Sequence, residues 1–188
     1  MERFEYKKYG ECQYPYDGDH PLLKHKYKIF YEIFSQTSKQ EIIISNIETN
    51  PQFKIGDDEI IIKQSTELLK DELHVFENNI KIGSIKKTGF ASLFPKFILE
   101  NKKSFHLKRI YKNLWYKFFT NQKEYIFSLN YENQTIEYFL LKKEYFDKNE
   151  GENGRTIIGN FTTKENNLKT ALIGLILINH FLQQENEY

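Results

Sequence analysis

The sequence predicts a mainly β protein, an antiparallel β-barrel of about twelve strands around a buried hydrophobic C-terminal helix. Sixteen Phe and thirteen Tyr bring the aromatic content to 16%, and aromatic residues favour strands. Short apolar runs follow one another at intervals of about ten residues, which is typical of a meandering sheet, sandwich or barrel. A single longer apolar run, near the C-terminus, breaks this rhythm and supplies the helix.

A length of 188 residues fits one domain and allows a sizeable core without disulfides. Cys12 is the only cysteine, so no internal disulfide can form, and this fits a reducing compartment. The first twenty residues contain no apolar segment of the kind found in secretory signals. We therefore expect a cytoplasmic protein, with peripheral attachment to a membrane as the variant to test.

Two segments are expected along the chain. Residues 1–26 are rich in charge and contain Pro15, Gly18 and Pro21, which predicts an irregular N-terminal lead-in. Residues 27–188 are expected to form the single barrel domain, because no linker divides them. Its predicted strands are residues 27–34, 41–45, 52–55, 59–63, 73–76, 81–85, 97–100, 105–110, 115–119, 125–130, 135–141 and 156–161.

The C-terminal apolar run, residues 168–184, has no single apolar stripe, so it is either a membrane span or the centre of a core. Its uncharged part, residues 170–184, covers about 22 Å as a helix, which is short of the hydrocarbon layer of about 30 Å. It also contains Asn179 and His180. The sequence therefore favours a buried core helix, and a tail-anchored membrane protein is the alternative.

This combination of a β-rich domain and an apolar C-terminal helix resembles the tubby C-terminal-like superfamily, which includes LURP-one-related proteins and phospholipid scramblases. The stretch Val75-Phe-Glu-Asn-Asn-Ile-Lys-Ile-Gly83-Ser-Ile-Lys-Lys87 is similar to the recurring hairpin of that group. Residues 125–129 followed by residues 135–141 resemble a second such hairpin. The resemblance implies a barrel wrapped around a hydrophobic helix, and a binding module that meets membrane lipids or regulates another protein. No functional residue of the family is carried over by these motifs.

The charge of the chain is concentrated in one segment. Residues 86–123 hold ten basic residues against the single acid Glu100, a net charge of +9 in a chain whose total is +1. Its candidate binding residues are Lys86, Lys87, Lys102, Lys103, Lys108, Arg109 and Lys112. A basic face of this kind attracts anionic lipid headgroups or an acidic protein, and nucleic acid is less favoured because the interleaved aromatics suit a core. The alternative is a solvated face with Phe inside and Lys outside.

The sequence contains no motif for catalysis. It lacks a Gly-x-Ser-x-Gly element and a phosphate-binding glycine loop. A loose group near the N-terminus lacks the paired spacing of a zinc site: Cys12, Asp17, Asp19, His20 and His25. We therefore expect no enzyme activity, no metal, no cofactor and no obligate small-molecule substrate.

These observations favour a non-enzymatic binding or regulatory module that recognises anionic lipid headgroups or a protein partner through a basic surface. Small size, the lack of a secretory signal and the lack of an active site also suit a bacterial immunity protein that neutralises a toxin, which is the alternative function.

Overall fold

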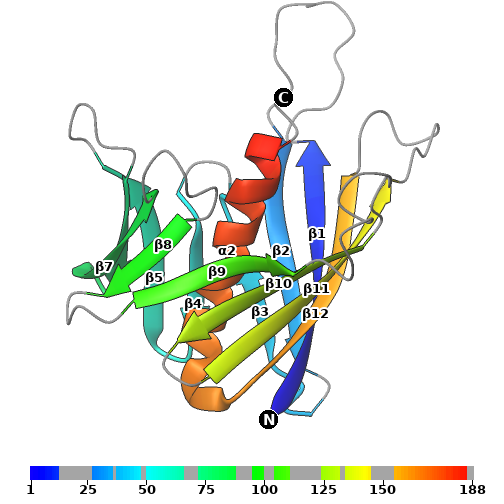
Figure 1. Ribbon diagram of the computed structural model, residues 1–188, viewed down its shortest axis with the longest axis horizontal. Helices are drawn as coiled ribbons and strands as arrows, with labels where there is room; N and C mark the ends of the chain where they lie inside the picture. The colour runs from blue at the N-terminus through cyan, green and yellow to red at the C-terminus, as the bar shows by residue number, and fades with distance from the viewer. Residues whose placement is uncertain are drawn as a thin grey trace, which may run out of the picture.

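The computed structural model describes residues 1–12, 27–35, 37–47, 50–65, 72–87, 95–99, 104–110, 124–131, 134–144 and 155–185. Figure 1 shows a strongly curved sheet with helix α2 lying along its concave face. The elements are β1 (Glu2–Cys12), β2 (Tyr27–Ser35), β3 (Glu41–Ile44), β4 (Gln52–Ile55), β5 (Asp58–Gln64), β6 (Glu72–Glu77), β7 (Ile80–Lys87), β8 (Pro95–Leu99), β9 (Ser104–Ile110), β10 (Glu124–Tyr131), β11 (Gln134–Glu144), β12 (Arg155–Thr163), the 3-10 turn η1 (Glu165–Asn167) and α2 (Leu168–Glu185).

All twelve strands belong to one sheet in the order β3-β2-β1-β12-β11-β10-β9-β8-β7-β6-β5-β4, and every pairing is antiparallel. Nearly all neighbours in the sheet are neighbours in the chain, as expected for a meander. The exception is the contact between the first strand and the last. The predicted mainly β, antiparallel architecture with one helix is therefore confirmed.

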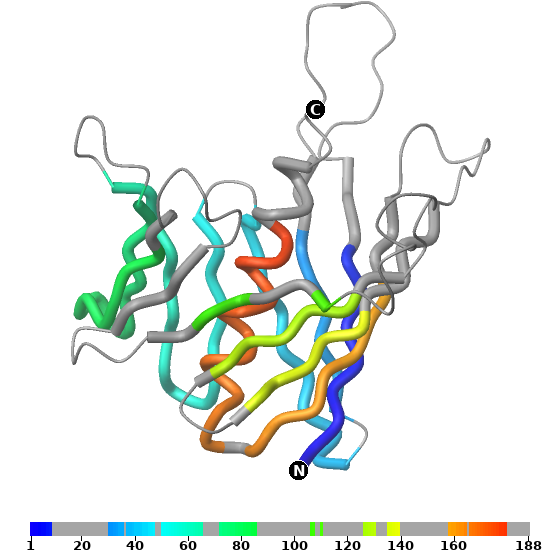
Figure 2. The backbone as a smooth tube through the Cα atoms, in the orientation of Figure 1, coloured from blue at the N-terminus to red at the C-terminus, as the bar shows by residue number. Residues whose placement is uncertain are grey.

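The expected irregular lead-in over residues 1–26 is wrong for residues 2–12, which form β1. This strand lies between β12 and β2 and pairs with both over most of its length (Figure 2). Phe4 and Tyr6 are buried while Arg3 and Glu5 are exposed, so the segment does alternate as a strand does. The many charged residues of this segment made the alternation difficult to recognise in the sequence. Residues 13–26 and the predicted strand at 115–119 lie outside the described residues.

The two end strands of the sheet, β3 and β4, meet at one pair of residues. The Ser45 amide donates to the Gln52 carbonyl at 2.9 Å, and the Gln52 amide donates to the Ser45 carbonyl at 3.0 Å. Such a reciprocal exchange is the repeating unit of an antiparallel ladder. Among the residues that the structure describes, the first and last strands of the sheet thus share one ladder contact.

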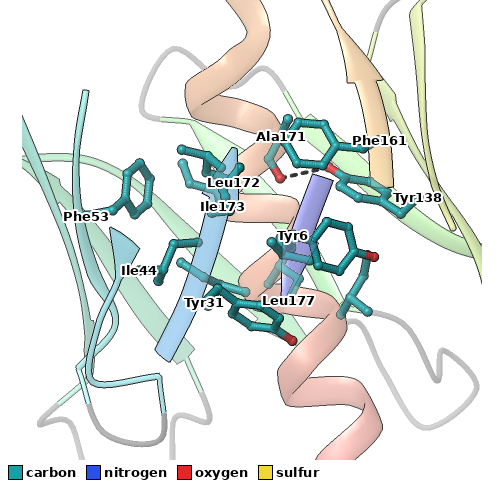
Figure 3. Packing of buried hydrophobic residues seen from close by; sticks show 14 of the residues in the cluster. Tyr6, Tyr31, Ile44, Phe53, Tyr138, Phe161, Ala171, Leu172, Ile173 and Leu177 are labelled. Atoms are coloured by element: carbon teal, nitrogen blue, oxygen red, sulfur yellow. Dashed lines mark hydrogen bonds between the residues drawn. The ribbon is translucent and has the colours of Figure 1, made fainter. Parts of the chain in front are cut away.

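The apolar helix α2 lies in the core, as the sequence predicted. Leu168 and all of residues 171–179 are buried, and most of the remaining core comes from the inward-facing residues of the strands. In Figure 3, Tyr138 and Phe161 face one side of the helix while Ile44 and Phe53 face the other. Each fully buried aliphatic side chain contributes about 1.5–3 kcal/mol, so this helix is a large part of the stability. Among the described residues, no helix is long and apolar enough to cross a membrane.

Polar contacts hold α2 at its first turn. The Lys169 ammonium donates a hydrogen bond to the Glu77 carboxylate at the end of β6. A second carboxylate, that of Asp58 at the start of β5, lies 3.6 Å from the same ammonium. Asp58 in turn accepts a hydrogen bond of 3.1 Å from the Asn78 amide in the turn between β6 and β7. This end of the helix is therefore tied to the hairpins β4–β5 and β6–β7.

A buried hydroxyl holds the middle of the helix. Tyr138 on β11 donates a hydrogen bond of 2.9 Å to the Ala171 carbonyl, drawn dashed in Figure 3. Burial raises the pKa of the Tyr138 hydroxyl far above its usual value, so this group remains a donor. The hydroxyl comes this close because residue 174 is glycine: a Cβ there would lie 2.3 Å from the Tyr138 oxygen.

A third polar contact lies near the other end of α2. The Asn179 side chain is 1% exposed, and its Oδ1 accepts hydrogen bonds from the Lys8 ammonium at 2.8 Å and the Tyr31 hydroxyl at 3.3 Å. Lys8 comes from β1 and Tyr31 from β2. Strands from three parts of the sheet thus fix the position of the helix along its axis and its rotation about that axis.

Candidate binding surface

The outer face of the sheet carries the candidate site, because α2 fills the inner one. On β9 the inward residue Leu107 is buried, whereas its neighbour His106 is exposed. Lys96 on β8 lies directly opposite His106, and Lys86 on β7 lies directly opposite Lys96. Directly opposed residues share a face of the sheet. Lys86, Lys96 and His106, the basic row, therefore occupy neighbouring outer positions on three adjacent strands.

Lys96 is the central position of the basic row, and its two neighbours in the row are a lysine and a histidine. With strands about 4.8 Å apart, its three Cα atoms lie within about 10 Å, and like charges directly opposite one another destabilise a sheet. Lys86 has an acid, Glu72, opposite it on β6. Lys96 instead lies between Lys86 and His106.

The row continues as a polar band over the next two strands. His106 is opposite Asn130 on β10, and Asn130 is opposite Thr135 on β11. The Thr135 hydroxyl donates a hydrogen bond of 3.0 Å to Oδ1 of Asn130. The surface therefore combines cationic positions with short polar side chains, which suits hydrogen bonding to phosphate or carboxylate oxygens.

The register divides the other predicted binding residues between the two faces. Lys108 shares the outer face with His106 and lies opposite Ser128, whereas Arg109 lies opposite the buried Phe127. Lys87, opposite Pro95, is on the other face from its neighbour Lys86. The remaining predicted residues, Lys102, Lys103 and Lys112, lie outside the described residues.

Two members of the basic row, Lys96 and His106, were not among the predicted binding residues. Lys86, Lys96 and His106 are ten residues apart in the sequence, but this spacing alone does not find them. In an antiparallel pair the separation of opposed residues changes along the strands: Ile85 and Phe97 are twelve apart, and Lys87 and Pro95 are eight apart. The register of the sheet is therefore needed to find the row.

The described part of the chain offers binding groups and no metal centre. Within it, no group of three His, Cys, Asp or Glu side chains is placed to hold a metal ion. Glu72 and His74 lie 3.5 Å apart on β6, and the ring of His74 also packs edge-on against Phe76. Comparison of the chain with protein-family models, with curated proteins and with solved structures finds no match.

Proposed function

We propose that this protein is a non-enzymatic binding module whose basic row holds an anionic group, supplied by a lipid headgroup or by an acidic protein segment. The observation that carries the proposal is the position of Lys96 between Lys86 and His106 on an outer face. Ammonium groups form charge-assisted hydrogen bonds with phosphate and carboxylate oxygens. Each lysine near an anionic membrane surface contributes about 1 kcal/mol.

We further propose that the sheet closes into a barrel around α2, in the manner of the tubby C-terminal-like superfamily. The reciprocal hydrogen bonds between Ser45 and Gln52 support closure, because they link the two end strands. The buried apolar helix supports it too, since a helix covered on all sides needs strands on all sides. In this arrangement the interior is filled by side chains, and ligands are left to the outer surface.

Removal of the two lysines of the basic row is expected to weaken binding to vesicles containing phosphatidylserine by about thirtyfold, because two contacts of about 1 kcal/mol each are lost. The measurement is co-sedimentation of the wild type and of K86Q/K96Q, at low and at high ionic strength. The matched control is K54Q/K164Q, which removes two exposed lysines outside the row. Wild-type binding should fall as salt screens the charges.

A second arm distinguishes the source of the anion. A fluorescent polyglutamate peptide replaces the vesicles, and its anisotropy is followed with the same variants. Binding of vesicles alone assigns a lipid headgroup, and binding of the peptide alone assigns an acidic protein. The proposal fails if wild type binds neither probe, or if K86Q/K96Q and K54Q/K164Q bind alike.

A further inference from the structure

An acid and an imidazole lie beside the basic row, on the neighbouring strand β6. Oε1 of Glu72 is 3.5 Å from Nε2 of His74, and the two side chains are only 12% and 22% exposed. The position directly opposite Glu72 on β7 is that of Lys86, the first member of the basic row. Glu72 is therefore shared between two basic groups, the imidazole on its own strand and the lysine across from it.

The total charge of these groups depends on pH, because the charge of a histidine side chain changes between about pH 5 and 8. While His74 is neutral, the negative charge of Glu72 compensates the positive charge of Lys86. Once His74 is protonated, the same groups together carry a net positive charge. The positions of His74 and Lys86 are diagonal neighbours across the strand pair, about 7–8 Å apart, so this added charge lies next to the basic row.

Other described residues also face the His74 ring. Phe76 on the same strand packs edge-on against it, with 6.4 Å between the ring centroids. Ser84 lies directly opposite on β7 and brings no charge, whereas Lys63 lies directly opposite on β5 and brings a positive one. The Lys63 ammonium lies over the ring of Phe76, 5.6 Å from its centroid. Within the described part of the chain, Glu72 is thus the group that links the charge of His74 to the basic row.

We propose that the Glu72–His74 pair makes the affinity of the basic row for its anion depend on pH, an inference that rests on the proposed function. Protonated His74 engages the charge of Glu72 and leaves Lys86 less compensated, so the anion binds more tightly at lower pH. One added cation near an anionic surface corresponds to about fivefold in affinity. Because linkage is reciprocal, binding of the anion is accompanied by uptake of a proton.

The test compares binding at about pH 5.5 and about pH 7.5, at one ionic strength. The probes are vesicles containing phosphatidylglycerol and the fluorescent polyglutamate peptide, whose phosphodiester and carboxylate groups stay negative over this range. Wild type should bind the probe that it recognises at least about fivefold more tightly at the lower pH. H74Q should lose this factor by binding weakly at both pH values, whereas E72Q should lose it by binding tightly at both.

The basic row has a histidine of its own, so H106Q is the matched control. It removes an imidazole from the row but leaves the Glu72–His74 pair, and the pH dependence due to that pair should persist in it. Because E72Q should gain affinity at the higher pH, a loss of structure cannot produce the expected pattern.

Two kinds of failure can be told apart. The inference is overturned, and the proposed function stands, if wild type binds equally at both pH values. The same holds if H74Q and E72Q keep the wild-type pH dependence, or if H106Q alone abolishes it. If wild type binds neither probe at either pH, the proposed function fails and this inference fails with it.

Discussion

Replacing Gly174 by alanine is expected to destabilise the protein by about 2–3 kcal/mol, although the same change inside most helices is stabilising by about 1 kcal/mol. The reason is the Tyr138 hydroxyl, which would lie 2.3 Å from the new methyl group, with a Leu129 methyl at 3.0 Å. Neither the helix nor β11 can retreat without disturbing the core. Urea unfolding followed by circular dichroism measures the loss, and an unchanged slope would show that the mechanism of unfolding is unchanged.

Tyr138→Phe is the matched partner of that variant. Alone, it should cost about 1 kcal/mol, because it removes the hydrogen bond to the Ala171 carbonyl. Combined with Gly174→Ala, it removes the atom that clashes, so the double variant should be more stable than Gly174→Ala alone. Strictly additive effects, or a stabilising Gly174→Ala, would show that the hydroxyl does not lie against the helix at this point.

Asn179→Leu is expected to have a similarly large effect, a loss of about 2–4 kcal/mol in the free energy of unfolding. The side chain keeps its volume, but the amide oxygen that accepts from both Lys8 and Tyr31 disappears. Removing one partner of a buried polar contact costs the desolvation of those that remain, and more when one is charged. Thermal or urea unfolding of the variant gives the value.

The same substitution is more easily tolerated when the cation is also removed. Lys8→Met combined with Asn179→Leu should recover part of the loss, since an apolar pair replaces a polar one. The polar contact would not be an anchor of the helix if Asn179→Leu left the free energy of unfolding unchanged. The same conclusion would follow if the double variant lost more stability than the two single variants together.

Much of the fold could be predicted from the sequence, because apolar residues recur with a different period in strands than in a helix. The alternation in residues such as Phe127, Leu129 and their neighbours predicted β10, and the all-round apolarity of residues 171–178 predicted the buried helix. Strand β1 was missed because its inward residues, Phe4 and Tyr6, alternate with charged residues that dominate the local composition. The local sequence pattern therefore predicted those elements in which apolar residues dominate the composition.

The contacts that position the helix could not be predicted in the same way. Lys8 and Asn179 are 171 residues apart, and Tyr138 and Ala171 are 33 apart, so their meeting depends on the register of the whole sheet. The composition of the candidate surface likewise could not be predicted without the register of the sheet. Lys108 and Arg109 are consecutive and were assigned to one basic face, but consecutive strand residues occupy opposite faces.

Amide hydrogen exchange, measured by NMR without detergent, tests most directly the central proposal that the sheet closes around α2. The amides of residues 172–178 are expected to exchange only through global unfolding. Their exchange rates should then depend on denaturant concentration in the same way as those of the central strands of the sheet. The amides of Ser45 and Gln52 should be protected too, because they bridge the end strands. Exchange of the helix through a separate local opening, or unprotected amides at Ser45 and Gln52, would contradict the account.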